Sequence, residues 1–177
     1  MPASVPPALP SFFSTRTAAC GIASTSGEAR PPLSRAERLG ADRGPYTLQA
    51  AIAACPARSF RPEETDWEEI VALYTELARA TSSPIIELNR AVAVSWASGP
   101  RDALPLVDLL VATGTLERYH LLHSVRGDLL DRLGRGEEAA SEFERAAELA
   151  TNGQDRSLMS ERAKASRLKR AADAGAV

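Results

Sequence analysis

The chain has 177 residues, of which 44% are hydrophobic and 25% are charged. This is the composition of one soluble globular domain. Its net charge of -2 excludes the strongly basic surface that a nucleic-acid-binding chain normally carries. Cys20 and Cys55 are far apart in the sequence, so we expect neither a disulfide framework nor a zinc site, and we expect a cytoplasmic location. The sequence shows no signal-peptide pattern and no membrane span, and we expect no membrane contact.

Residues 1–32 are rich in Pro, Ser, Thr and Ala and show no apolar period, so we expect this segment to be disordered. The pattern becomes helical from residue 33. Residues 33–40 have the pattern of a short amphipathic turn, and Pro45 then opens a helix that Pro56 closes. We predict an all-α fold over residues 33–172, in which antiparallel helical hairpins stack as a tetratricopeptide-like repeat domain.

The next two helices each carry an apolar face. Asp66 is a good N-cap for the first of them, whose apolar face consists of Trp67, Ile70, Val71, Tyr74 and Leu77. Ser83 and Pro84 start the second, which Gly99 ends, and its apolar stripe consists of Ile85, Leu88, Val92 and Trp96. Residues 101–112 supply its antiparallel partner helix. We interpret the two tryptophans as core residues that pack between repeats rather than as ligand platforms.

The most regular hairpin lies in residues 120–150. Two antiparallel helices approach closely when small side chains lie at their crossing and large ones fill the flanks. Five residues of this stretch match the small and large positions of such a repeat: Gly127, Leu130, Ala139, Phe143 and Ala146. Gly134 and Gly136 bracket the turn between the helices. This hairpin follows the previous one by about 36 residues, close to the tetratricopeptide period of about 34, although Ser95 and Trp96 depart from the usual pattern.

Candidate functional residues come from the expected groove lined by the first helix of each hairpin. We predict partner contacts there at Asn89, Arg90, His123 and Arg126. Residues 154–170 form a last helix whose basic residues could meet nucleic acid or an acidic partner, but we favour a solvated helix face. His120 and His123 lie three residues apart near Glu117 and could present ligands to a metal on one helix face, but we favour packing or surface roles for the histidine pair.

No known catalytic, phosphate-binding or dinucleotide-binding motif is present in the sequence. Glu63, Glu64, Glu68 and Glu69 surround a helix start, where they favour the helix dipole, so we do not interpret them as acid-base catalysts. We therefore predict no catalytic residue, no cofactor, no metal and no small-molecule substrate, and an enzyme is the weakest of the functional interpretations.

Four blocks of the chain carry a resemblance to a known family. In order, they are GPYTLQAAIAAC, DWEEIVALYTEL, SPIIELNRAVAVSWASGP and YHLLHSVRGDLLDRLGR. Together they resemble the tetratricopeptide-like C-terminal extension found in a subgroup of bacterial extracytoplasmic-function RNA polymerase sigma factors. The resemblance implies a role in transcription initiation, with core RNA polymerase or the remaining sigma-factor domains as partners. Promoter DNA would be contacted only through sigma regions that are missing here.

The N-terminal segment suggests a reason for the missing regions. When residues 13–23 are back-translated with GC-rich codons and read in a shifted frame, one permitted product is LDQDRRLWDR, which is similar to the family segment expected upstream. We hypothesise that Met1 to about Arg30 is translated out of frame.

Two functional interpretations therefore compete. The first is a fragment of a sigma factor whose helical extension serves protein-protein contact or regulation. The second is a free-standing tetratricopeptide-like adaptor that binds a protein or peptide.

Overall fold

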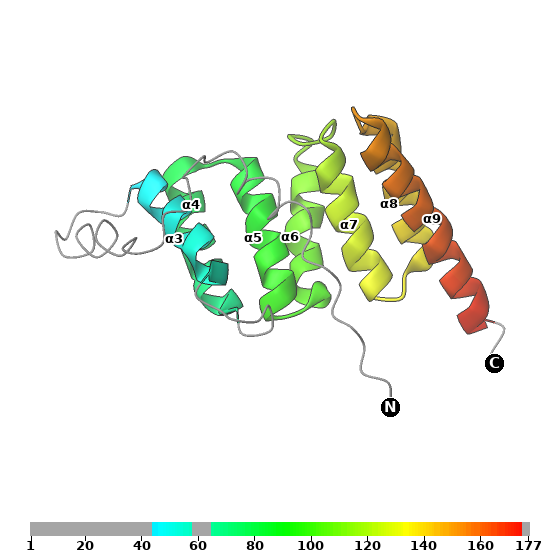
Figure 1. The fold of residues 1–177 in the computed structure, drawn as a ribbon, viewed down its shortest axis with the longest axis horizontal. Helices are drawn as coiled ribbons and strands as arrows, with labels where there is room; N and C mark the ends of the chain where they lie inside the picture. Colours follow the sequence, from blue (N-terminus) through cyan, green and yellow to red (C-terminus); the bar gives the residue numbers. More distant parts are fainter. Residues whose placement is uncertain (1–43, 58–64, 175–177) are drawn as a thin grey trace. The chain divides into compact units, whose positions relative to one another are not determined.

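The computed structural model describes residues 44–57 and 65–174, and in these ranges the chain forms seven α-helices and no strand (Figure 1). The helices are α3 (Pro45–Ala57), α4 (Trp67–Thr81), α5 (Pro84–Ala97), α6 (Pro100–Ala112), α7 (His120–Arg132), α8 (Gly136–Leu149) and α9 (Gly153–Ala174). The all-α fold expected from the sequence is confirmed. The segment 1–32, for which disorder and a shifted reading frame were predicted, and the turn at 33–40 lie outside the described residues.

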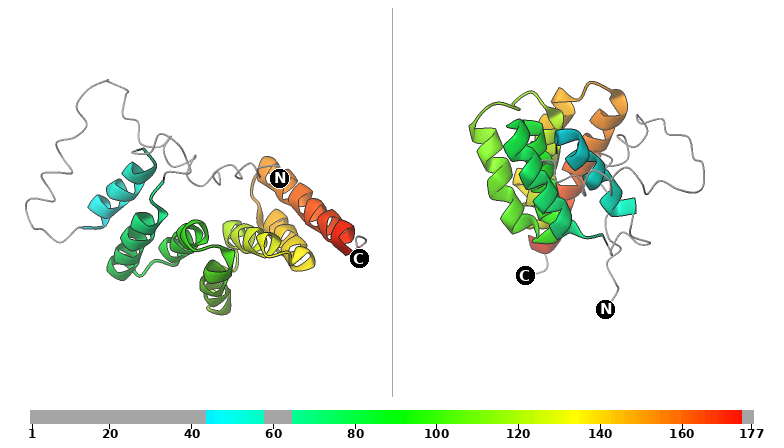
Figure 2. Two further views of the ribbon diagram at one scale, coloured as in Figure 1. Left: turned by 90° about the horizontal axis from the view of Figure 1, so that it is seen from below. Right: turned by 90° about the vertical axis from the view of Figure 1, so that its left-hand side faces the viewer.

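The helices pack as successive hairpins. α5 and α6 form one hairpin, α7 and α8 form the next, α3 packs on α4, and α9 packs on α8. α5 also contacts α7, and Figure 2 shows α5 and α7 on one side of the stack with α6 on the other. We call α5, α7 and α9 the first helices and α4, α6 and α8 the second helices.

The helix ends follow from local sequence signals. The Asp66 Oδ1 accepts a hydrogen bond of 2.9 Å from the Glu69 amide, as expected of an N-cap. Gly134 has a φ of 76°, and the amides of Gly134 and Arg135 return to the Asp131 and Leu130 carbonyls at 3.0 and 2.9 Å. This is the Schellman arrangement that ends a helix at a left-handed residue, and it explains the glycine between α7 and α8.

Two predicted helix limits need correction. α3 continues one residue past Pro56 to Ala57, because a proline this near the end of a helix removes only its own N–H hydrogen bond and leaves the preceding turns intact. α9 extends from Gly153 to Ala174, beyond the predicted range of 154–170. Its Asn152 side chain caps the start by accepting a hydrogen bond of 2.7 Å from the Asp155 amide.

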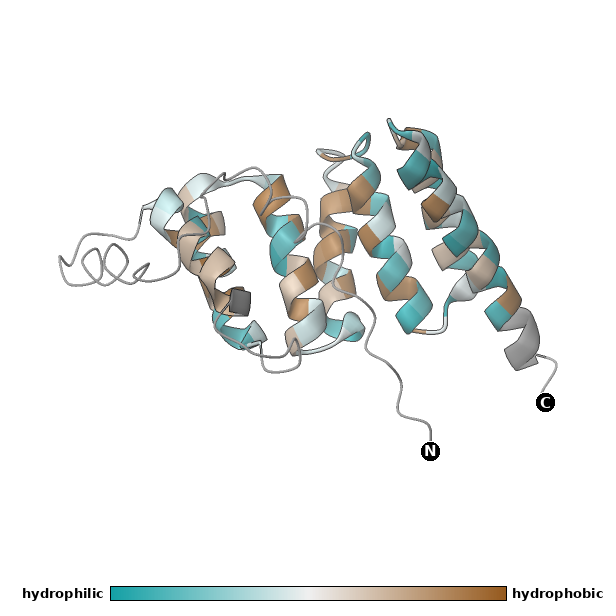
Figure 3. Cartoon of the chain, viewed as in Figure 1, coloured by the Kyte–Doolittle hydropathy of each residue, from teal (hydrophilic) through white to brown (hydrophobic). Residues whose placement is uncertain are grey.

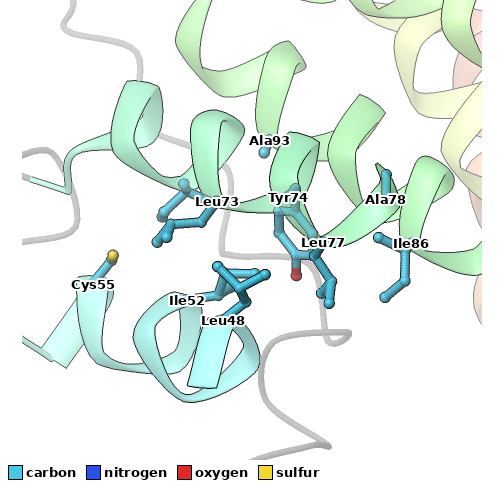
Figure 4. Packing of buried hydrophobic residues seen from close by; sticks show 10 residues of the cluster. Leu48, Ile52, Cys55, Leu73, Tyr74, Leu77, Ala78, Ile86 and Ala93 are labelled. Carbon is cyan, nitrogen blue, oxygen red and sulfur yellow. The ribbon is translucent and has the colours of Figure 1, made fainter. Parts of the chain in front are cut away.

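The hydrophobic core begins with a cluster shared by α3, α4 and α5. Figure 4 shows how side chains of these helices meet there, and its fully buried members include Leu48, Ile70 and Leu77. One residue of the predicted α5 stripe is placed differently, since Ile85 is 39% exposed while its neighbour Ile86 is buried. Successive helical residues differ by about 100° in direction, and α4 packs on the side of α5 that Ile86 faces.

α7 and α8 approach each other closely at Gly127. Gly127, Leu130, Ala139, Phe143 and Ala146 are all buried there. A Cβ added to Gly127 would lie only 2.7 Å from the Phe143 ring, so the ring fills the space that the missing side chain leaves.

The C-terminal helices are much more polar than the N-terminal ones. Figure 3 shows hydrophobic residues concentrated in α3, α5 and α6 and hydrophilic residues along α8 and α9. α9 buries only Met159, Ala163 and Ser166 among its residues of described burial. Contacts between charged side chains therefore supply a larger part of the packing at this end of the stack.

Replacing Gly127 by Ala tests the close approach. Alanine favours a helix by about 1 kcal/mol, but overpacking a filled core costs about 1–3 kcal/mol, and the Phe143 ring that the new methyl group would meet is fully buried. We expect Gly127→Ala to lower the free energy of unfolding by about 1 kcal/mol in urea denaturation.

Gly153→Ala is the matched control, because nothing lies within 4 Å of a Cβ built at that position of α9. Combining Gly127→Ala with Phe143→Leu should cost less than the sum of the two single changes, since the smaller side chain makes room for the new methyl group. A Gly127→Ala protein as stable as the unmodified chain would contradict the close approach.

Candidate functional site

The exposed side of the first helices is defined by a stripe along α7. Leu121, Ser124, Asp128 and Arg132 recur at helical spacing, and Leu121, Ser124 and Asp128 are half-buried while Arg132 is exposed. Asp128 and Arg132 reach in opposite directions, toward α9 and α5 respectively, so the stripe lies between the two neighbouring first helices.

Arg132 joins α7 to the end of α5. Its two terminal nitrogens donate to the Ser95 carbonyl at 2.9 Å and to the Ser95 hydroxyl at 3.2 Å. The last carbonyls of a helix lack partners within the helix and carry partial negative charge. The guanidinium of Arg132 therefore caps α5 from the next repeat, and it accounts for a serine that is only 4% exposed.

The same guanidinium lies on a pair of stacked tryptophans. Its central carbon is 5.6 Å from the centroid of the Trp96 ring, and Trp96 stacks on Trp67 of α4 with centroids 5.4 Å apart and planes inclined by 17°. Cation–π and stacking contacts of this kind each contribute about 0.5–1.5 kcal/mol. The two tryptophans thus pack between helices of successive hairpins, but both are half-buried rather than the core residues that the sequence predicted.

α9 is held on the other side of the stripe. Arg162 donates to Asp128 at 2.5 Å, and its guanidinium carbon lies 4.3 Å from the centroid of the Phe143 ring. Lys169 pairs with Asp131 at 3.5 Å. Asp128 of the stripe and the nearby Asp131 therefore form ion pairs with α9.

Several basic residues of α9 form ion pairs with carboxylates of the preceding helices. Arg167 forms two hydrogen bonds, of 2.6 and 3.0 Å, with Glu144 of α8, and the hydrogen bond lowers the pKa of Glu144 below its ordinary value of 4.5. Three of the cations that gave α9 its basic sequence, Arg162, Arg167 and Lys169, are thus paired with carboxylates of α7 and α8. This arrangement favours intramolecular packing over a nucleic-acid contact.

The four predicted contact residues do not share one face. Asn89 is half-buried and lies two turns before Trp96 on the same side of α5. Arg90 is about 100° further round the helix, and its Nε donates to Glu87 at 2.7 Å. Asn89 therefore shares the Trp96 side of α5, whereas Arg90 is turned away from it and paired with Glu87.

His123 and Arg126 point from α7 toward the second helices. His123 Nδ1 is 2.8 Å from Glu142 of α8, and Arg126 donates to Asp108 of α6 at 2.8 Å and also to Glu142. Burial opposes ionisation of Glu142, but the hydrogen bond from His123 and the charge of Arg126 outweigh it and lower the pKa of Glu142 below 4.5. Partner contact at these two residues stays a prediction, and such a partner would compete with this network.

We define the first-helix face by six residues: Asn89 and Trp96 of α5, and Leu121, Ser124, Asp128 and Arg132 of α7. It combines aliphatic, aromatic, amide and hydroxyl groups with one ion-paired carboxylate and one guanidinium. Such a surface can hold a protein segment by apolar contact and hydrogen bonding, because its charges are already matched.

Metal binding finds no support in the described ranges 44–57 and 65–174. No group of three His, Cys, Asp or Glu side chains there could hold a metal ion. His120 lies 3.7 Å from Asp155 and His123 pairs with Glu142, so the two imidazoles turn to different carboxylates. Within the same ranges, no helix is both long enough and apolar enough to span a membrane.

Comparison with known proteins identifies the fold. The NMR structure of the first TPR domain of the human RPAP3 protein matches with a TM-score of 0.57 at 21% identity, over 73% of this chain and 96% of that one. The fold is that of a tetratricopeptide-repeat domain. No protein-family model matches the chain.

One curated relative was found in Rhizobium meliloti (strain 1021). This chain is 53% identical to its uncharacterized protein R00370 over 112 residues, which are 63% of this chain and 26% of that protein. The chain therefore spans about a quarter of the length of the relative it matches.

These comparisons correct the family resemblance drawn from the sequence. The matched structure is a tetratricopeptide-repeat domain of a different protein and the curated relative is uncharacterized, so neither identifies the chain as part of a sigma factor. The four blocks behind the resemblance fall mainly on α3, α4, α5 and α7. Their amphipathic patterns encode helix packing, which tetratricopeptide repeats of other families require as well.

The sequence-based prediction missed Arg132 and Asp128, which join the repeats. A signal was present, because Arg132 follows Trp96 by about 36 residues, the spacing of the repeat, and equivalent positions of adjacent repeats lie side by side. The departure of Ser95 and Trp96 from the usual pattern marks the place where Arg132 binds.

Replacing Arg132 by Met tests its role in joining α7 to α5. Methionine keeps the aliphatic bulk but loses the two hydrogen bonds to Ser95 and the cation–π contact. We expect the free energy of unfolding to fall by about 1–2 kcal/mol, measured by far-UV circular dichroism in urea.

Arg135→Met is the control, since Arg135 is exposed and forms its ion pair with Glu138, three residues along the chain, and an exposed pair contributes little. Arg132→Lys should restore only part of the loss, because an ammonium lacks the planar fork of the guanidinium. Equal stability of the Arg132→Met and Arg135→Met proteins would rule out the proposed cap.

Proposed function

We propose that this chain is a protein-interaction module that binds a protein or peptide segment on the first-helix face. The observation that carries this proposal is the partly exposed stripe of α7, from Leu121 to Arg132, beside the half-buried Asn89 and Trp96 of α5. The tetratricopeptide-repeat fold supports it, because stacked helical hairpins present extended surfaces of this kind to partners.

The composition of the first-helix face supports the same proposal. Tryptophan and arginine are enriched among the residues that contribute most to protein-protein binding. Trp96 and Arg132 are already held in one geometry by Trp67 and Ser95, so a partner would order few additional side chains on binding them. The amide of Asn89 offers both a donor and an acceptor for a peptide backbone.

We propose no catalytic role for the titratable residues that the structure brings together. His123, Arg126, Glu142 and Asp108 are hydrogen-bonded to one another, and this supports a structural role in joining α6, α7 and α8. A cytoplasmic location stays a prediction from the isolated cysteines of the sequence.

Site-specific photocrosslinking tests which side of the stack meets a partner. We would place a photoreactive phenylalanine analogue at Leu121 on the first-helix face or at Leu109 on α6, which is 64% exposed. After exposure to a lysate of the organism that encodes the chain, we expect one discrete crosslinked protein from the Leu121 position, identified by mass spectrometry, and none from Leu109. Equal crosslinking from both positions, or crosslinking from Leu109 alone, would contradict the proposal.

Two neighbouring variants then test the placement of Asn89. Asn89→Ala removes an amide from the first-helix face and should lower the crosslinking yield at Leu121 about fivefold to tenfold, the effect of losing roughly 1–1.4 kcal/mol of binding. Arg90→Ala is the matched control on the adjacent residue, which pairs with Glu87. Circular dichroism establishes that both variants are folded before their yields are compared.

A further inference from the structure

His123 has a hydrogen-bond acceptor at each of its two ring nitrogens. Nδ1 lies 2.8 Å from the Glu142 carboxylate of α8, and Nε2 lies 3.2 Å from the backbone carbonyl of Glu117 in the loop between α6 and α7. A neutral imidazole has one N–H and can donate to only one acceptor, whereas the imidazolium ion donates from both nitrogens. The geometry is therefore that of a doubly protonated ring.

The charges around His123 favour this form. The hydrogen bond to Glu142 raises the pKa of His123 above its ordinary value of 6.5, against the opposing effect of burial. The titratable and charged groups that face the ring or its immediate partners are Glu142 and Arg145 of α8, Arg126 of α7, Asp108 of α6 through Arg126, and Glu117 of the loop. Glu142 also binds Arg126, so its carboxylate stays ionised beside the ring.

We propose that His123 is a proton-operated clamp that fastens the α6–α7 loop to the α7–α8 hairpin. In the imidazolium form, one ring joins three segments: α7, which carries it, α8 through Glu142, and the loop through the Glu117 carbonyl. When the ring loses a proton, the remaining N–H stays toward the carboxylate, which is the stronger acceptor. Nε2 then presents a lone pair to the Glu117 carbonyl, and the loop is released.

The sign of the pH dependence follows from the raised pKa. The unfolded chain has a histidine of ordinary pKa, so folding takes up a proton in the range between the two values. The stabilisation is complete below the ordinary pKa of 6.5 and is lost as the pH rises through the higher value of the folded protein. The clamp therefore opens as the pH rises above the ordinary histidine pKa of 6.5, through the raised pKa of the folded protein.

The chain contains two histidines, which allows a matched test. We would measure the melting temperature from about pH 6 to about pH 8.5 for the unmodified chain, His123→Gln and His120→Gln. The unmodified chain and His120→Gln should lose about 3–8 °C over this range relative to His123→Gln, which lacks the titrating ring. An identical pH slope in His123→Gln and the unmodified chain would overturn the proposal.

Two further measurements, an NMR titration and hydrogen exchange, keep the test decisive if His123→Gln folds poorly. An NMR titration should give a pKa above 6.5 for one histidine, and Glu142→Gln should lower that value because the glutamine carries no negative charge. Hydrogen exchange, corrected for its intrinsic pH dependence, should accelerate in residues 113–119 above that pKa while α9 stays unchanged as an internal reference. A pKa of His123 at or below 6.5, with the signal assigned by its presence in His120→Gln, would refute the clamp. Unchanged protection of the loop would refute it as well.

Discussion

One aromatic ring holds the C-terminal half of the stack together. Phe143 of α8 lies against Gly127 of α7 on one side, where a Cβ would come within 2.7 Å of the ring, and against the guanidinium of Arg162 of α9, whose carbon lies 4.3 Å from the ring centroid. The glycine sets how closely α7 and α8 approach. The same Arg162 binds Asp128 at 2.5 Å, so the position of α9 depends on both helices of the preceding hairpin.

Long polar side chains then connect this part of the stack to the preceding repeat. Asp128 lies between Arg162 and Arg132, at 2.5 and 4.0 Å, and Arg132 continues the connection to Ser95 and Trp96 of α5. In a repeat protein, stability is close to a sum of terms within each repeat and terms between neighbours. Here polar contacts between neighbouring repeats connect α5, α7 and α9 directly, while α9 buries only Met159, Ala163 and Ser166 among its residues of described burial.

The sequence predicts the helices well because their signals are local. Asp66 as an N-cap and Gly134 as a left-handed residue act within one helical turn. The partners of Arg132 and His123 are not predictable in this way, because each reaches a different helix and the choice depends on which way a long or rotatable side chain turns. Periodicity shows which face of a helix is apolar, but it does not show which polar side chains pair within the chain, as Arg90 does with Glu87.

The stacked tryptophans give the molecule an intrinsic optical label. Trp67 and Trp96 are the two tryptophans of the chain, and they lie face to face where α4 meets α5. Tryptophan emission therefore reports on that one junction, whereas the far-ultraviolet signal averages over every helix. If the repeats separate stepwise under denaturant, the two signals will change at different concentrations, and if the stack unfolds as a unit they will coincide. The cooperativity of the stack can thus be measured without attaching any dye.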